Sequence, residues 1–374
     1  FPDSLGQSPG CKFYCRKPIM TQHAQVAAAG LSAEDIYRDL SGKLRDVVPD
    51  VELRYKADLA FRINKLKTQR NAIILGHNYM EPALYHSITD IKGDSLELSR
   101  AVTTVDQETI VFCGVRFMAE TAKVLNPRKT VLFPGTKGGC SLADGMTAAD
   151  VRSLKQRFPG VPVVTYINTH ADVKAESDIC CTSGNASKVV ESLKSDTVIF
   201  IPDEYLARNV ARETKRHIIF PVANSNLRED TLLDYQMIGW HARCEVHDKF
   251  TTEDVANVYK QFPDVVILAH PECSPEVVES VDFCGSTSAM IKFVETSNAQ
   301  RYLLLTECSM GDNIAAANPG KEMLRLCSVR CPHMNEITLE DTLQSLIRMQ
   351  YVVEIPEEIR VKAYNAVYRM LSLN

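Results

Sequence analysis

The sequence predicts an α/β protein built from three homologous three-layer αβα domains, each with a parallel sheet between helices, around a pseudo-threefold axis. Three stretches, at 72–102, 162–192 and 265–295, share one pattern: an apolar strand, a polar triplet, and a Gly/Ser/Thr turn that opens an amphipathic helix. A second strand and helix follow each stretch. Strands that alternate with helices of about 10–15 residues are typical of parallel sheets covered by helices, so we expect three copies of one strand-helix-strand-helix unit.

The repeat also predicts how the chain divides into domains. We expect three repeats followed by a helical segment, at 55–140, 141–244, 245–331 and 332–374. The helices at 338–374 are expected to pack on the first repeat, and a further strand is expected to close each of the first two repeats. Residues 1–54 form an extension of unassigned role. Because the chain begins with Phe1, we expect a processed product or part of a longer chain.

Composition and charge exclude several classes of protein. With 374 residues, 45% of them hydrophobic, the chain can bury sizeable cores. A formal net charge of -5 and the lack of a long Lys/Arg run argue against a nucleic-acid partner. No apolar run approaches the roughly 20 residues that cross a bilayer, and the N-terminal stretch does not resemble a secretory signal. We therefore expect no membrane contact and a cytoplasmic or other reducing compartment, an organelle included if the chain is processed.

Twelve cysteines are many for such a chain, and the repeat sorts them. One cysteine ends each repeat at an equivalent place: Cys140 in "GGCSLADG", Cys244 in "HARCEVHDKF" and Cys331 in "SVRCPHMN". Equivalent positions in three similar domains can converge on one axis, where three thiolates form a metal site with one open coordination position. Five others are expected to be small buried side chains, namely Cys113, Cys180, Cys181, Cys273 and Cys284. Cys11 and Cys15 stay unassigned.

Zinc and a 4Fe–4S cluster both accept thiolate ligands. We favour the cluster, because its three-cysteine form leaves one iron free to bind a substrate oxygen as a Lewis acid. A zinc site closed by the nearby His247 is the alternative, and three unrelated cysteines that happen to follow each repeat are another.

The strand ends and the Gly/Ser/Thr turns provide further candidate site residues. Six polar residues are expected to face the axis from the strand ends: His77, Tyr79, Tyr166, Asn168, His270 and Glu272. His and Glu can act as acid or base near neutral pH, and Tyr can donate a proton. Ser95, Ser183, Ser286 and Thr287 stand at predicted helix starts, where backbone N–H groups favour carboxylates and phosphate. Simple N-capping is the alternative role for these hydroxyls.

Nine short motifs occur in the order that one enzyme family shows: "GHNYMEP", "GDSLELSRA", "GVRFMAETAK", "YINTHADVKAESD", "TSGNA", "CEVHDKF", "HPECSPEV", "GSTSAMIK" and "CPHMNEITL". From about residue 55 to the C-terminus the chain resembles the quinolinate synthase A family. The resemblance implies three homologous domains around a 4Fe–4S cluster held by Cys140, Cys244 and Cys331. It also implies condensation of iminoaspartate with dihydroxyacetone phosphate to quinolinate, with loss of phosphate and water, in de novo NAD biosynthesis.

The resemblance carries the substrate-contacting and catalytic positions over to His77, Tyr79, Ser95, Tyr166, Asn168, Ser183, His247, His270, Glu272 and Thr287. Among these we expect His77, Tyr79, His247, His270 and Glu272 to be catalytic. The expected partners are the two small-molecule substrates, the enzyme that supplies iminoaspartate, and iron–sulfur assembly factors.

Two departures and two rival functions accompany the resemblance. The segment with "CKFYCRKPIMTQ" matches no part of the compact family members, and the spacing of Cys327 and Cys331 lacks the CxxCxxC pattern with which some relatives can form a disulfide. We therefore expect no redox switch of that kind. A zinc-dependent aldolase or hydrolase is the enzyme alternative. An iron–sulfur sensor would have a basic output surface or a DNA-reading helix, and the sequence shows neither.

Overall fold

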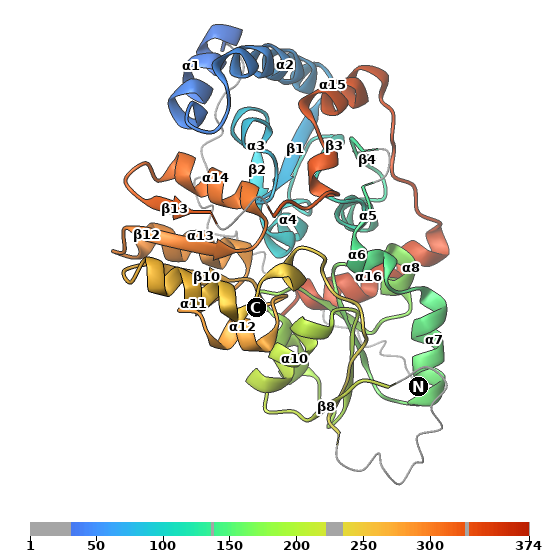
Figure 1. The fold of residues 1–374 in the computed structure, drawn as a ribbon. Helices are drawn as coiled ribbons and strands as arrows, with labels where there is room; N and C mark the ends of the chain where they lie inside the picture. The colour runs from blue at the N-terminus through green and yellow to red at the C-terminus, as the bar shows by residue number, and fades with distance from the viewer. Residues whose placement is uncertain (1–30, 136–137, 222–234, 326–328, 374) are drawn as a thin grey trace, which may run out of the picture.

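The structure is a computed structural model that describes residues 31–135, 138–221, 235–325 and 329–373. Three separate parallel sheets form three lobes, coloured blue to teal, green, and yellow to orange along the chain (Figure 1). The predicted fold class is confirmed. Cys11, Cys15 and Cys327 lie outside the described residues, so their interpretation stays a prediction.

Each sheet places its first strand beside a short edge strand, and all strand pairs are parallel. The first sheet has the order β2 (Ile91–Gly93), β1 (Ala72–His77), β3 (Thr109–Cys113), β4 (Thr130–Leu132). The second has the order β6 (Ile179–Cys181), β5 (Val163–Tyr166), β7 (Val198–Ile201), β9 (Met237–Ile238), β8 (Ile218–Ile219). The third has the order β11 (Phe283–Cys284), β10 (Val266–Ala269), β12 (Arg301–Leu305), β13 (Glu322–Leu324).

The helices alternate with these strands. Those of the N-terminal part and the first lobe are α1 (Ala33–Leu44), α2 (Asp50–Gln69), α3 (Pro82–Ser87), α4 (Ser95–Ala101) and α5 (Arg116–Leu125). Those of the second lobe are α6 (Ser141–Asp144), α7 (Ala148–Arg157), α8 (Ala171–Ala175), α9 (Ala186–Ser192) and α10 (Glu204–Glu213). The third lobe has the 3-10 turn η2 (His247–Lys249), α11 (Thr252–Gln261), α12 (Pro275–Glu279), α13 (Thr287–Thr296) and α14 (Cys308–Ala317). The turn η3 (Met334–Glu336), α15 (Leu339–Arg348) and α16 (Glu357–Leu371) follow.

Two local features differ from the prediction. A short helix and an edge strand stand between the first strand and the Gly/Ser/Thr turn of every repeat, as with α3 and β2. The third repeat also ends in a closing strand, β13, whereas the sequence predicted a closing strand only for the first two repeats. An aspartate fixes each edge segment, because the carboxylates of Asp90, Asp178 and Asp282 accept the N–H of Ile74, Val163 and Ile267 at 2.8–2.9 Å.

The three lobes contact one another in a cycle. In α5, the Glu120 carboxylate accepts the N–H of Ala171 at the start of α8 at 3.0 Å. Asn209 of α10 donates to the carbonyl of Cys273 before α12 at 3.0 Å. Asn313 of α14 donates to the carbonyl of Met80 before α3 at 2.9 Å. The helix after the second inner strand of each lobe thus contacts the next lobe near its first short helix, through a carboxylate acceptor in α5 and through amide donors in α10 and α14. This cyclic order fits a pseudo-threefold axis.

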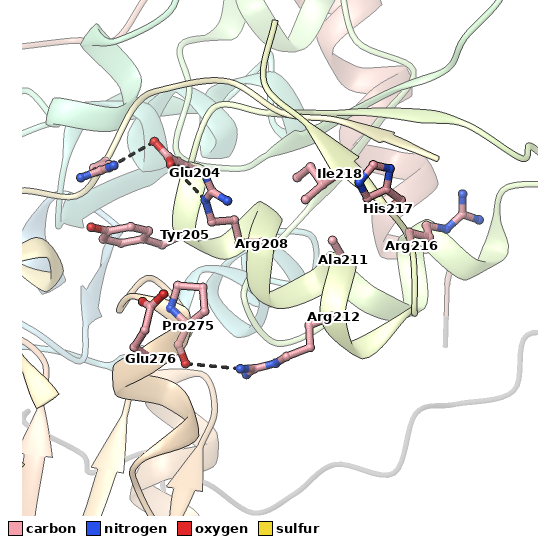
Figure 2. Close-up of a pocket in the computed structure, with 11 residues that line it drawn as sticks. Glu204, Tyr205, Arg208, Ala211, Arg212, Arg216, His217, Ile218, Pro275 and Glu276 are labelled. Atoms are coloured by element: carbon pink, nitrogen blue, oxygen red, sulfur yellow. Dashed lines mark hydrogen bonds and ion pairs between the residues drawn. The ribbon is translucent and has the colours of Figure 1, made fainter. Parts of the chain in front are cut away.

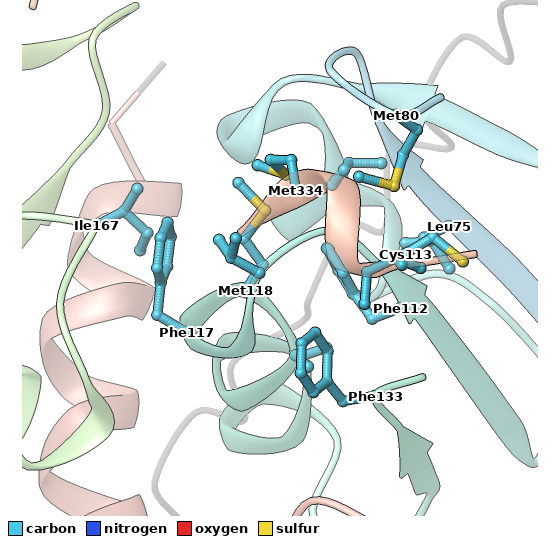
Figure 3. Close-up of a cluster of buried hydrophobic side chains, with 14 of the residues drawn as sticks. Leu75, Met80, Phe112, Cys113, Phe117, Met118, Phe133, Ile167 and Met334 are labelled. Atoms are coloured by element: carbon cyan, nitrogen blue, oxygen red, sulfur yellow. The ribbon is translucent and has the colours of Figure 1, made fainter. Parts of the chain in front are cut away.

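The cores lie between the sheets and their helices, and the largest joins the first lobe to the C-terminal segment. Figure 3 shows Met334, which comes from η3, beside Met118 of α5, in one buried cluster with Phe112 and Cys113 of β3. Of the cysteines expected to be buried, Cys113, Cys180, Cys181 and Cys273 are buried, whereas Cys284 is only partly so.

The terminal helices cover the outside of the first two lobes (Figure 1). Helix α15 packs on α2, and α16 packs on α8 and β6 of the second lobe and on α5 of the first. Helix α2 begins at Asp50 and so crosses the expected boundary at residue 55. Within the described ranges, no helix is both long and apolar enough to cross a membrane.

Candidate active site

The carboxyl ends of the inner strands of all three sheets border one cavity of about 70 Å³. This is where a parallel sheet places its ligands. Thirteen of the predicted site residues line it: His77, Tyr79, Ser95, Cys140, Tyr166, Asn168, Ser183, Cys244, His247, His270, Glu272, Thr287 and Cys331. The lobes therefore bring together residues that are more than 250 positions apart in the sequence.

The hydroxyls at the helix starts differ in what they do. Ser95 is the first residue of α4, and Thr287 is the first residue of α13. Ser183 lies before α9, which begins at Ala186, so the prediction that Ser183 opens a helix is wrong although it lines the cavity. Ser286 stays outside the lining, and its hydroxyl accepts the N–H of Ala289 at 3.3 Å as the N-cap of α13.

Glu272 contacts polar side chains of the cavity with both of its carboxylate oxygens. The Tyr166 hydroxyl donates to its carboxylate at 2.5 Å, and Asn168 Nδ2 lies 3.4 Å from the same oxygen. His247 Nδ1 lies 2.7 Å from the other oxygen, in ion-pair contact without an aligned hydrogen bond. Burial alone would raise the pKa of Glu272, but the adjacent His247 and the Tyr166 hydrogen bond outweigh it and lower the pKa. Glu272 is therefore a buried carboxylate held in its ionised form.

Tyr79 connects to this carboxylate through a threonine. Its hydroxyl makes a short hydrogen bond with Thr306 Oγ1, which lies 2.9 Å from His247 Nε2. Burial raises the pKa of Tyr79 well above its ordinary value, so the side chain keeps its proton at neutral pH. Hydrogen bonds thus link Tyr79 through Thr306 to His247, whose Nδ1 lies 2.7 Å from the Glu272 carboxylate.

Two histidines in equivalent places share one tautomer. His77 Nδ1 accepts the N–H of Tyr79 at 3.2 Å, and His270 Nδ1 accepts the N–H of Glu272 at 3.3 Å. Burial lowers the pKa of His77 to about 4 and that of His270 to about 3, so both rings are neutral at pH 7. Since Nδ1 is an acceptor, the proton must sit on Nε2. His270 then donates to Ser183 Oγ at 3.1 Å.

The three cavity cysteines share one local geometry. Each precedes a short helical turn whose backbone N–H groups, two and three residues further on, act to lower the pKa of its thiol: Leu142 and Ala143, Val246 and His247, His333 and Met334. Such N–H groups favour a thiolate. Burial nevertheless dominates and raises the pKa of Cys140 to about 12 and that of Cys331 to about 11. Partly buried cysteines with N–H groups beside their thiols fit a metal centre, whose positive charge would offset the cost of ionisation.

A metal could also contact residues beyond the cysteines. Ligand atoms of Cys244, His247 and Glu272 all lie within 4.8 Å of one another. This grouping shares Cys244 and His247 with the zinc alternative, which also requires Cys140 and Cys331. Of the two ring nitrogens of His247, Nε2 contacts Thr306 at 2.9 Å, whereas Nδ1 lies 2.7 Å from Glu272 without an aligned hydrogen bond.

Sequence reasoning missed Thr306 and Glu307, which follow β12 directly. Glu307 lines the cavity and accepts the N–H of Ser309 at 2.7 Å. Burial raises the pKa of Glu307 to about 7. Polar residues directly after the first apolar strand of each repeat were identified as site candidates. The same criterion, applied to the second strand of the third repeat, would have found both.

A larger cleft of about 670 Å³ lies beside α10, facing α12 (Figure 2). Its arginines already have partners: Arg212 contacts Glu279 at 2.5 Å, and Arg243 contacts the buried Glu204 at 3.2 Å. We therefore interpret this cleft as part of the contact between the second and third lobes. Because Arg243 directly precedes Cys244, the Glu204 contact also fixes that cysteine's segment.

Fold and cavity together define a three-lobed α/β enzyme with a candidate metal centre at the junction of its lobes. The family model "Quinolinate synthetase A protein" matches residues 61–372. A quinolinate synthase of Sinorhizobium fredii is 50% identical over 331 residues, which cover 88% of this chain and 87% of the relative. A quinolinate synthase of Xylella fastidiosa (strain 9a5c) is 50% identical, in an alignment that covers 83% of this chain and 86% of the relative. One of Caulobacter vibrioides (strain NA1000 / CB15N) is 46% identical, and its alignment covers 88% of this chain and 86% of the relative.

The chain belongs to the quinolinate synthetase A family, as its motifs predicted.

Proposed function

We propose that this protein is a quinolinate synthase that condenses iminoaspartate with dihydroxyacetone phosphate and releases phosphate and water, for NAD biosynthesis. One observation carries the proposal: acid–base residues from three lobes line a single cavity together with one cysteine from each repeat. Relatives that are 46–50% identical and bear that name support the same activity.

The cavity is equipped to hold anions. Asn78 Nδ2 donates to Thr287 Oγ1 at 3.0 Å, which leaves the hydroxyl proton of Thr287 free to donate to a ligand. Since His270 donates to Ser183, the Ser183 hydroxyl proton is free in the same way. The Nε2–H of His77 is a third donor. The substrates carry two carboxylates and a phosphate, which accept such hydrogen bonds.

The path from Tyr79 to Glu272 can move the protons of condensation and dehydration. Glu272 is ionised and so serves as the base that withdraws a proton from the carbon or nitrogen of a bound intermediate. Tyr79 keeps its proton and donates it to a leaving oxygen, while Thr306 and His247 return a proton to Tyr79. His77 and His270 are neutral, so they stabilise developing negative charge as hydrogen-bond donors.

Cys140, Cys244 and Cys331 would hold a 4Fe–4S cluster with one iron free of protein ligands. When bound, that iron supplies Lewis-acid chemistry that helps a hydroxyl leave as water. No net oxidation or reduction of the cluster is part of the proposal.

Access requires the lobes to move. A space of about 70 Å³ holds roughly two water molecules, far less than either substrate. We propose that the lobes separate to admit the substrates and close again to shield the imine from water. The short life of an imine in water is also why we propose contact with the enzyme that supplies it, and a cluster enzyme needs assembly factors in a reducing compartment.

The two neighbouring hydroxyls at the start of α13 provide a direct test of function. Thr287→Val removes a donor that lines the cavity, so we expect quinolinate formation from iminoaspartate and dihydroxyacetone phosphate to fall about 10-fold or more, the usual value of a hydrogen bond to a charged group. Ser286→Ala removes only the N-cap and should cost about 1 kcal/mol of stability with turnover retained. Mass detection of quinolinate from anaerobically purified protein measures both. A wild-type protein that carries the full cluster but forms no quinolinate would contradict the proposed function.

A further inference from the structure

Polar contacts join the three cysteine segments pairwise. Between the first and second, the N–H of Glu245 points at Ser141 Oγ at 3.4 Å. The second and third meet where His333 Nε2 lies 3.1 Å from Glu245 Oε1. Between the third and first, Glu336 Oε2 accepts the N–H of Gly138 at 2.6 Å. Each contact is made within five residues of a cavity cysteine, so the segments form a closed ring.

Within this ring, His333 contacts both other segments. Besides its contact with Glu245, its ring lies so close to Gly139 that a Cβ there would be 3.3 Å from His333 Cε1. The same Cβ would be 2.9 Å from the Asp144 carboxylate. A side chain at position 139 would therefore push against His333, and glycine permits the close packing of the first and third segments.

The contact between Glu245 and His333 is also partly exposed to solvent. Their side chains are 40% and 26% exposed, whereas the polar residues behind them, such as His247 and Glu272, are at most 4% exposed. A small molecule that approaches iron bound by the cysteines from this side meets segments that this contact holds together. Neither side chain lines the substrate cavity.

We propose that Glu245 and His333, together called the clasp, retain the iron–sulfur cluster by holding the Cys244 and Cys331 segments together. The proposal rests on the proposed function, in which these cysteines are cluster ligands. Both are positioning residues: they act through the ligand segments and do not touch the substrate. The clasp slows the outward movement of a ligand segment, and therefore the loss of iron, without altering the acid–base path.

The test compares the rate at which iron leaves the anaerobically purified holoprotein in excess EDTA, followed by the loss of visible absorbance. A partly exposed contact between a histidine and a carboxylate is worth up to about five-fold in an equilibrium, so Glu245→Ala and His333→Ala should each release iron about five-fold faster than wild type. The double variant should release it no faster than either single variant, because one contact cannot be lost twice. Turnover per bound cluster should be unchanged.

A matched control is Glu322→Ala, which removes a similarly exposed partner of Arg301, 2.8 Å away on the surface of the third lobe. It should leave the release rate unchanged. The urea midpoint of the apoprotein should shift no more for the clasp variants than for this control, which separates cluster retention from general stability. If an alanine variant does not accumulate, Glu245→Gln, which keeps the side-chain shape but removes the charge, makes the same comparison.

The outcomes separate the two proposals. A wild-type holoprotein with a full cluster whose release rate matches those of both single variants would overturn the clasp alone. Rates that multiply in the double variant would also overturn it, because the two residues would then act independently. A wild-type protein that binds no iron would overturn the proposed function.

Discussion

Replacing Thr306 with valine tests the proposed proton path at the residue that links Tyr79 to His247. The substitution keeps the shape of the side chain and removes the hydroxyl that contacts both the Tyr79 hydroxyl and His247 Nε2, which themselves make only a long contact at 3.5 Å. Two buried polar atoms lose their partner, at about 1–3 kcal/mol each if left unsatisfied. Because they are close enough to approach each other, we expect a total loss of about 1–3 kcal/mol.

The effect on catalysis should exceed the effect on stability. A positioned proton carrier contributes roughly 10²–10⁴-fold to a rate, and partial repair between Tyr79 and His247 places Thr306→Val near 10²-fold. The assay is quinolinate formation per bound cluster, with the free energy of unfolding measured on the same samples. Thr306→Ser keeps the hydroxyl and should retain most activity. Thr342→Val, at a buried threonine of α15 that does not line the cavity, should lose stability only. Near-normal turnover of Thr306→Val would remove this path from the mechanism.

Glu272→Gln should keep the cluster and its colour but lower quinolinate formation by about 10²-fold or more, since the carboxylate is proposed as a base and not as a ligand; turnover close to wild type would exclude it as the base. Serine at any of the three cavity cysteines should abolish the cluster, whereas Cys181→Ser should cost about 1–3 kcal/mol and leave the iron content intact; the reverse pattern in iron analysis would refute the assignment. The folded state lowers the pKa of His77 from 6.5 to about 4 and that of His270 to about 3. The unfolded chain therefore takes up protons first, and urea midpoints of the apoprotein should fall as the pH drops from about 6.5 toward 4; constant midpoints over this range would show that these rings are not held neutral.

The fold and much of the cavity could be predicted because the repeat fixes geometry. Parallel strands present their carboxyl ends at one edge, so a polar residue after an apolar strand, such as His77 or His270, falls where ligands bind. The three cysteines followed from the same reasoning, since equivalent positions in three lobes converge. A repeat therefore gives long-range information that a single motif does not.

The features that the sequence did not predict depend on which of two neighbouring residues faces the cavity, on contacts with distant parts of the chain, or on strands too short to show a pattern. Ser286 and Thr287 are neighbours, yet one caps α13 and the other lines the cavity, and nothing in their sequence decides which. Thr306 follows an ordinary strand, and its importance comes from Tyr79 and His247, which belong to other parts of the chain. The strand Glu322–Leu324 has three residues, too few for a periodic signal, and it forms because β12 offers a free edge.

The central claim is that one cysteine from each lobe holds an iron–sulfur cluster at the cavity. The most direct test is the visible spectrum together with the metal and sulfide content of anaerobically purified wild-type protein. The account predicts a brown protein with broad visible absorbance and about four iron atoms and four sulfides per chain. A colourless protein that contains zinc and no sulfide would contradict it.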